Sequence, residues 1–158
     1  MIVWLEKALV RAIHERQIAE HGGSVGVRDE AVLESALARA QQLQAYRDPA
    51  PDLADLAAAL AFGLARNHPF VDGNKCTAAV CCETFVELNG ARIEADDAEL
   101  FPRYLTLAEG KLPQRAFATW LRERLRSAPG DSVHERRKPY RARPRSTGGT
   151  AARARSGG

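Results

Sequence analysis

The chain has 158 residues, of which 45% are apolar, and a formal net charge of +3. This is enough for one globular domain with a real core. Charge interrupts every apolar run well before it could cross a membrane, and residues 1–6 lack the basic start and long apolar stretch of a signal peptide, so we expect a cytoplasmic protein without membrane contact. The charge is uneven, because residues 128–158 carry +6 and residues 1–127 carry −3.

Apolar residues recur at helical spacing in six segments, which predict helices over residues 4–20, 30–40, 53–67, 75–88, 97–108 and about 113–126. Asp29, Asp52 and Asp96 precede three of these segments as N-caps, and Pro113 suits the first position of the last. Glycines at 22–23, 90 and 110 fit helix ends. The alanine-rich segment 53–67 is expected to pack closely in the middle of a bundle.

The remaining segments break the helical pattern. Residues 41–51 lose it and contain two prolines, so we expect a loop there that could act as a mobile flap. Arg92 and Ile93 fit a short extended piece. Because no segment alternates for long with period two, the fold class is predicted as all-α, a bundle of about six helices. The domain covers residues 1–127, and residues 128–158, rich in Pro, Gly, Ser and Arg, form a disordered basic tail.

One stretch concentrates chemically active side chains between two predicted helices. Residues 68–78 read His-Pro-Phe-Val-Asp-Gly-Asn-Lys-Cys-Thr-Ala. A tight turn at Gly73 and Asn74 lets the next helix start at Asn74 or Lys75, with its N–H groups and partial positive charge directed at an anion. A histidine and an aspartate beside an anion site indicate chemistry on a phosphate.

Each of these side chains has a functional and a structural interpretation. His68 suits a general base, and the alternative is a turn histidine bonded to backbone; Asp72 four residues later favours the base. Asp72 suits a Mg²⁺ ligand, which is compatible with capping the next helix. Asn74 could cap that helix or bind a phosphate or the metal shell. We expect Phe70 to anchor the loop in the core.

Residues outside the stretch carry weaker signals. His14, beside an apolar helix face, is interpreted as a packed or surface histidine rather than a catalytic one. Arg66 and Asn67 could contact a nucleotide, although Arg66 is equally well explained as a solvated charge at a helix end. The adjacent Cys81 and Cys82 are interpreted as small apolar residues of a reduced compartment.

The stretch at 68–78 resembles the signature of the Fic/Doc family, and specifically its death-on-curing (Doc) branch. Further similarities stand in the same order within residues 1–126: Ile13-His14-Glu15, Gly22-Gly23, Gly26-Val27-Arg28-Asp29, Ser35-Ala36-Leu37, Asn67-His68, Leu88-Asn89-Gly90 and Ala108-Glu109-Gly110. The resemblance implies a compact helical fold that holds a nucleotide at this loop. The Fic branch mostly transfers AMP to a protein hydroxyl, whereas Doc-type toxins transfer a phosphoryl group to a threonine of elongation factor Tu.

The resemblance also implies the ligands and partners. ATP and Mg²⁺ would be bound, with His68 as the base, Asp72 on the metal, and the nucleotide contacted by Gly73, Asn74, Lys75 and Cys76. A small antitoxin protein would lay a helical segment across the site. Lys75 is typical of the Doc branch, where the terminal phosphate faces the target, and it favours a kinase over an AMP transferase.

Cys76 departs from the family pattern. An arginine usually stands at this position and holds the oxygens of the transferring phosphate. Loss of such a cation can cost on the order of 10³–10⁵ in rate. The chain is therefore expected to be a weakened or inactive enzyme, and a catalytically dead module that still binds antitoxin is the alternative. A regulatory thiol is the less favoured interpretation.

The basic tail raises the question of nucleic-acid binding. Arginine-rich segments bind phosphates. Tyr140 is the single aromatic residue in residues 128–158, so stacking residues do not alternate with the basic ones. A solubilising or incidental extension is the favoured interpretation, and nucleic acid is not expected as a partner.

Overall fold

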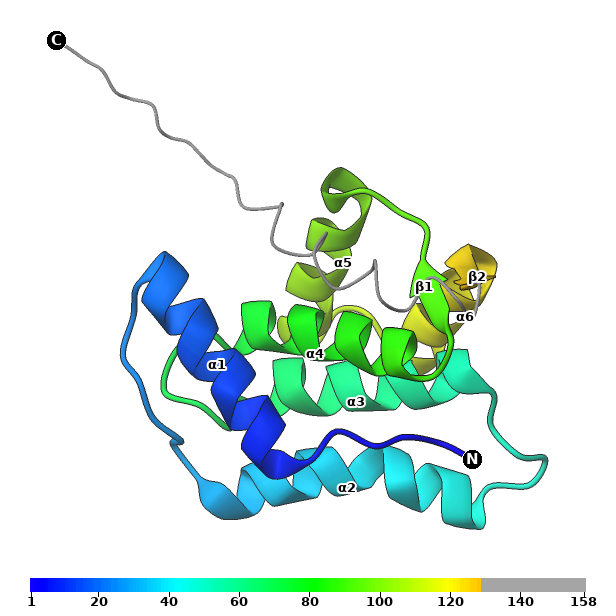
Figure 1. Ribbon diagram of the computed structural model, residues 1–158, viewed down its shortest axis with the longest axis horizontal. Coiled ribbons are helices and arrows are strands. Elements are labelled where there is room, and N and C mark those ends of the chain that lie inside the picture. Colours follow the sequence, from blue (N-terminus) through cyan, green and yellow to red (C-terminus); the bar gives the residue numbers. More distant parts are fainter. Residues whose placement is uncertain (129–158) are drawn as a thin grey trace, which may run out of the picture. The chain divides into compact units, whose positions relative to one another are not determined.

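The computed structural model describes residues 1–128 and consists of six helices with one small sheet (Figure 1). The helices are α1 Lys7–His21, α2 Glu30–Tyr46, α3 Leu53–Asn67, α4 Asn74–Leu88, α5 Asp97–Ala108 and α6 Gln114–Arg124; the strands are β1 Ala91–Ile93 and β2 Leu125–Ser127. The predicted all-α bundle of about six helices is confirmed. The predicted disordered tail lies outside the described residues apart from Ala128.

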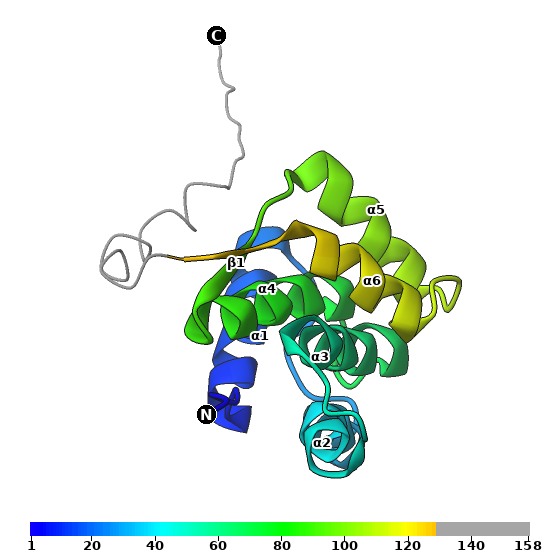
Figure 2. The same ribbon diagram turned by 90° about the vertical axis from the view of Figure 1, so that its right-hand side faces the viewer.

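Helix α3 is the centre of the bundle. Ten of its fifteen residues are buried, and it packs against α2 on one side and against α4 and α6 on the other (Figure 2). Small side chains allow this close packing: a Cβ atom added to Gly63 would lie 3.1 Å from the Cα atom of Ala36 in α2. The alanine-rich sequence of α3 thus places it where we expected, in the middle of the domain.

Short-range capping bonds define three helix starts as the sequence predicts. The Asp29 carboxylate accepts the Val32 N–H at 3.2 Å, and Asp96 accepts the Glu99 N–H at 3.0 Å. Asp52 and Asp55 form a reciprocal capping box at the start of α3. These bonds satisfy N–H groups that a helix leaves without an internal acceptor.

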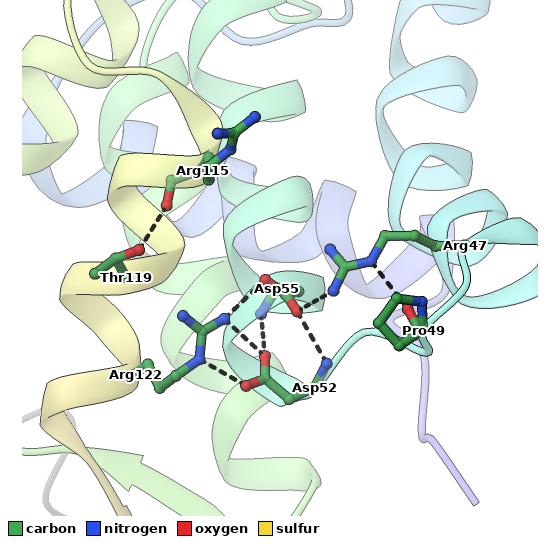
Figure 3. Close-up of polar contacts among 7 residues, drawn as sticks. All are labelled: Arg47, Pro49, Asp52, Asp55, Arg115, Thr119 and Arg122. Atoms are coloured by element: carbon green, nitrogen blue, oxygen red, sulfur yellow. Dashed lines mark hydrogen bonds and ion pairs between the residues drawn. The ribbon is translucent and has the colours of Figure 1, made fainter.

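The start of α3 also carries a cluster of ion pairs (Figure 3). The Arg122 guanidinium of α6 donates to Asp52 at 2.7 Å and to Asp55 at 2.8 Å. Arg47, directly after α2, donates to the other oxygen of Asp55 at 2.8 Å. The cluster therefore joins the ends of α2 and α6 to the beginning of α3.

The predicted loop over residues 41–51 is wrong in its first half. Helix α2 continues to Tyr46, because Ala40 is buried and Leu43 half-buried, so the inward-facing stripe of Leu33 and Ala36 extends by two more turns. The intervening glutamines are good helix formers. The connection to α3 is short, and residues 41–46 belong to a helix instead of the predicted flap.

Two helix ends also differ from the prediction. The first helix begins at Lys7 instead of residue 4, because the preceding segment is extended and Val3 exchanges two backbone hydrogen bonds with the Asn89 side chain. The last helix ends at Arg124 instead of residue 126. Residues Leu125–Ser127 form β2, which pairs antiparallel with β1. The extended piece predicted at Arg92 and Ile93 is confirmed as β1.

None of the helices in residues 1–128 has both the length and the apolar character needed to cross a membrane.

Candidate active site

The motif loop connects the end of α3 to the start of α4. Pro69 disfavours the right-handed helical conformation at the residue before it, which explains why α3 ends at Asn67. The C-cap residue His68 lies in the left-handed region, at φ 52° and ψ 60°. Gly73 ends the loop with φ 75°. A Cβ atom at Gly73 would lie 3.1 Å from Cδ1 of Ile18, so both the conformation and the close packing favour glycine.

The His68 side chain is exposed. Its ring makes no hydrogen bond within residues 1–128, so the alternative of a turn histidine bonded to backbone is not seen. Its own carbonyl accepts a hydrogen bond from the Arg28 guanidinium at 2.7 Å. The imidazole is thus free to meet a substrate hydroxyl, as a general base must.

Asp72 is held at two atoms. Its Oδ2 accepts the Ser24 backbone N–H at 2.8 Å, and its carbonyl oxygen lies 2.8 Å from His14 Nε2. It does not cap α4, because Gly73 occupies the N-cap position and no side chain caps this helix. The structural interpretation of Asp72 as a capping residue is therefore wrong. Oδ1 accepts no hydrogen bond within the described chain.

Asn74 closes the loop. Its amide oxygen accepts the Phe70 N–H at 2.8 Å, and its amide nitrogen donates to the Phe70 carbonyl at 2.9 Å. Phe70 is only 1% exposed, which confirms it as the core anchor of the loop. The Asn74 side chain thus fixes the turn, and a direct contact with a phosphate or metal stays a prediction.

The start of α4 offers free hydrogen-bond donors. The first bond of the helix joins the Thr77 N–H to the Gly73 carbonyl at 2.9 Å, so the N–H groups of Asn74, Lys75 and Cys76 precede it and have no capping side chain. Together with the helix dipole, such a group of donors binds anions. The residues present therefore fit the phosphates that the sequence predicts here.

The side chains of Lys75 and Cys76 differ in what they could offer to an anion at the start of α4. Lys75 Nζ lies 4.3 Å from the centre of the half-exposed Phe101 ring of α5, a geometry in which the ring attracts the ammonium group. Cys76 is half-buried on the first turn of α4 and supplies no charge comparable to an arginine.

A metal at this site would depend on few protein ligands. Residues 1–128 contain no group of three or more His, Cys, Asp or Glu side chains able to hold an ion. Mg²⁺ commonly takes one or two carboxylates and completes its shell with water and phosphate oxygens. The single carboxylate of Asp72 fits that requirement when a nucleotide supplies the other oxygens.

Arg66 and Asn67 take different positions. A Cβ atom at Gly110 would lie 2.8 Å from Arg66 Nε, so the exposed Arg66 guanidinium lies against the connection between α5 and α6. The Asn67 carbonyl accepts a hydrogen bond from Arg28 at 3.0 Å.

Three residues that contact the motif were not predicted from the sequence to belong to the site: His14, Ser24 and Arg28. The structure brings them to the motif from α1 and from the α1–α2 connection, which lies at the same end of the bundle as the motif loop (Figure 1). His14 and Arg28 fall in segments that resemble the family, which was the one signal available in the sequence. Of the two descriptions predicted for His14, packed or surface, the first is correct, because the residue is only 2% exposed.

Comparison with known proteins identifies the family to which this helical fold and its motif belong. The model of the Fic/DOC family matches residues 4–86, more than half of the chain, so the chain belongs to this family.

Two relatives indicate the branch of the family to which the chain is most similar. Toxin Doc of Mycolicibacterium smegmatis is 48% identical over 75 residues, which are 48% of this chain and 58% of that protein. Protein kinase doc of Escherichia phage P1 is 32% identical over 117 residues, or 74% of this chain and 91% of that protein. Both relatives carry the Doc name, in agreement with the resemblance to the Doc branch.

Proposed function

We propose that this chain is a Doc-type toxin that transfers the γ-phosphate of ATP, with Mg²⁺, to a Ser or Thr hydroxyl of a translation factor of the elongation factor Tu type. One observation carries the proposal: the uncapped start of α4, with Lys75 on it, directly follows the exposed His68 and the Asp72 carboxylate. The names of the two relatives, a toxin and a protein kinase, support it.

Each residue would have a defined part in the transfer. The N–H groups of residues 74–76 and the Lys75 ammonium would bind phosphate oxygens. Asp72 would hold Mg²⁺, which neutralises negative charge on the phosphates when bound. His68 would accept the proton of the hydroxyl whose oxygen forms the new bond to phosphorus, while ADP leaves.

Cys76 makes the chain as written a slow enzyme under this proposal. A thiol cannot place a positive charge on the transferring phosphate, and such a charge contributes on the order of 10³–10⁵ to phosphoryl-transfer rates. We therefore expect Cys76→Arg to raise transfer of the γ-phosphate to elongation factor Tu by at least about 10³-fold, with His68→Ala abolishing it in the same background.

Labelled ATP tests this expectation. Label at the γ-phosphate should appear on the target, and label at the α-phosphate should not. Transfer of α-label would replace the kinase with an AMP transferase. If the Cys76→Arg protein transferred neither label, the kinase proposal would be abandoned.

Cys76 also favours a second candidate function, a binding module that no longer transfers a phosphoryl group but still binds the antitoxin. The antitoxin would be a small protein that covers the active-site groove. Titration of ATP·Mg²⁺ into the chain as written separates the two candidates: tight binding without turnover supports the module, and turnover equal to that of Cys76→Arg removes it. Growth arrest of the host by Cys76→Arg, relieved by His68→Ala, would support a toxin.

A further inference from the structure

His68, the proposed general base, and Asp72, the proposed metal ligand, are both held through their backbone carbonyls by side chains from the N-terminal part of the chain. His14 and Arg28 supply these contacts. Neither side chain belongs to the motif, and they lie 58 and 40 residues away from their partners in the sequence.

The contact of His14 has a defined chemistry. Because a carbonyl oxygen only accepts hydrogen bonds, the 2.8 Å contact with Asp72 requires a proton on His14 Nε2. The ring also stacks on Phe70, with centroids 3.9 Å apart and planes 7° from parallel. His14 therefore fixes the loop at Phe70 and at Asp72, and the Asn74 side chain holds the backbone of Phe70 with two hydrogen bonds.

Arg28 fixes the other end of the loop. Its Nε and Nη2 donate to the carbonyls of His68 and Asn67 at 2.7 and 3.0 Å, and its backbone N–H donates to the Pro69 carbonyl at 2.7 Å. His68 is the only non-glycine residue of the described chain with positive φ. Such a conformation persists where the surroundings hold it, and the guanidinium satisfies carbonyls that the end of α3 leaves free.

We infer that His14 and Arg28 are positioning residues of the transfer site, an inference that rests on the proposed function. His14 acts on Asp72, whose carboxylate is also fixed at Oδ2 by the Ser24 N–H. Arg28 acts on His68. Reacting groups must be held within about 0.5 Å of their productive geometry, and loss of a supporting partner typically costs about 10–100-fold in metal affinity or activity.

The two residues act through different groups, so their variants should fail differently. His14→Phe keeps a ring to stack on Phe70 and removes the donor to Asp72. It should raise the Mg²⁺ concentration for half-maximal transfer by about 10-fold or more and lower kcat. Arg28→Lys keeps the charge but loses the two-donor geometry. It should lower kcat by about 10-fold with the Mg²⁺ requirement unchanged.

Transfer is measured in the Cys76→Arg background, and two variants serve as comparisons. His14→Gln, which retains an N–H donor, should recover part of the lost Mg²⁺ affinity. Arg16→Gln, which alters an exposed ion pair of α1 with Glu20, should match the parent. The inference is overturned if His14→Phe and Arg28→Lys keep the parental kcat and Mg²⁺ requirement, or if both change these two quantities in the same way.

A second measurement is independent of activity. Hydrogen exchange of the Ser24 amide reports the bond to Asp72 Oδ2 in the full chain. His14→Phe should speed this exchange about 10-fold or more, with the amides in the middle of α1 unchanged. Unchanged Ser24 protection would refute the role of His14. If the parent transferred no phosphate, the proposed function would fail, and Ser24 exchange would still decide whether His14 positions Asp72.

Discussion

At the residue scale, the three cysteines of the chain differ in their surroundings. Cys81 and Cys82 are fully buried in α4, and burial raises the pKa of both thiols, that of Cys82 to about 12. A thiol in this environment stays protonated and unreactive. Cys76 is half-buried at the start of the same helix. The interpretation of Cys81 and Cys82 as small apolar residues is confirmed by their burial.

We expect DTNB to react with one thiol, Cys76, in the native protein and with all three cysteines in denaturant. The physical reason is that attack on the reagent needs an accessible thiolate. Absorbance of the released thiolate measures the number of reactive thiols. The Cys76→Ser variant should have no reactive thiol under native conditions. Rapid modification of three thiols without denaturant would show that α4 opens readily.

Gly73 is the residue that lets the motif loop enter α4, and its substitution should destabilise the fold. Gly73→Ala would force alanine to φ 75° and bring its Cβ against Ile18. Gly90→Ala is the matched control, since Gly90 has φ 86° but open space around it. Backbone strain should cost about 1–2 kcal/mol in each, with an additional loss of about 1 kcal/mol at Gly73 from crowding. Urea unfolding measures the free energy of unfolding of both variants. Equal losses of stability would contradict the contribution from crowding at Gly73.

At the element scale, the beginning of α3 depends on capping and on charge. Asp52 caps the helix and pairs with Arg122, and hydrogen bonds from that guanidinium lower the pKa of Asp52 well below its ordinary value of 3.8. Because the pKa is lower in the folded state, the contribution to stability is complete above about pH 4 and declines as the pH falls further.

Asp52→Asn separates these two roles, because asparagine caps helices about as well as aspartate. The variant should lose about 1 kcal/mol of unfolding free energy at pH 7, a small value because half of the Asp52 side chain is exposed. The difference from the parent should shrink between pH 4 and pH 2. Asp52→Ala should lose about 1 kcal/mol more at pH 7. A constant difference between parent and Asp52→Asn across this pH range, measured by urea unfolding, would contradict the ion-pair account.

At the scale of the whole molecule, the strand that follows the last helix, β2, is held to the domain by pairing with β1. Ile93 lies opposite Leu125 in this pairing, Glu94 donates its N–H to the Arg124 carbonyl at 2.8 Å, and Arg126 pairs with the Glu94 carboxylate at 2.7 Å. The buried core within the described residues lies between Leu5 and Leu121. The residues needed for stability should therefore end with β2.

We expect a chain that ends at residue 128 to unfold with the same midpoint as the full chain. A chain that ends at residue 124 loses β2 and should be less stable by about 1–3 kcal/mol, the range for losing several backbone hydrogen bonds. Thermal unfolding followed by circular dichroism measures both. A large loss of stability on ending the chain at residue 128 would overturn the predicted domain boundary at residue 127.

Features that depend on neighbours within a few residues are predictable from the sequence alone. Caps at Asp29, Asp52 and Asp96, the alanine-rich α3, and the glycine turn before α4 are local features, because their hydrogen bonds and backbone preferences involve residues three or four positions apart. The site motif is readable for the same reason, since His68, Asp72 and Lys75 fall in one short stretch.

The way in which the motif is held depends on contacts between distant parts of the chain. His14 and Arg28 reach it from another helix and another loop. The strand β2 replaces the last two residues predicted for the last helix, and α2 is longer than predicted because its added residues pack against the core. These contacts join residues far apart in the sequence, and their free energy comes from packing and from hydrogen bonds that form once the helices have met. A single sequence contains the local preferences of these residues but not which distant partner each one meets.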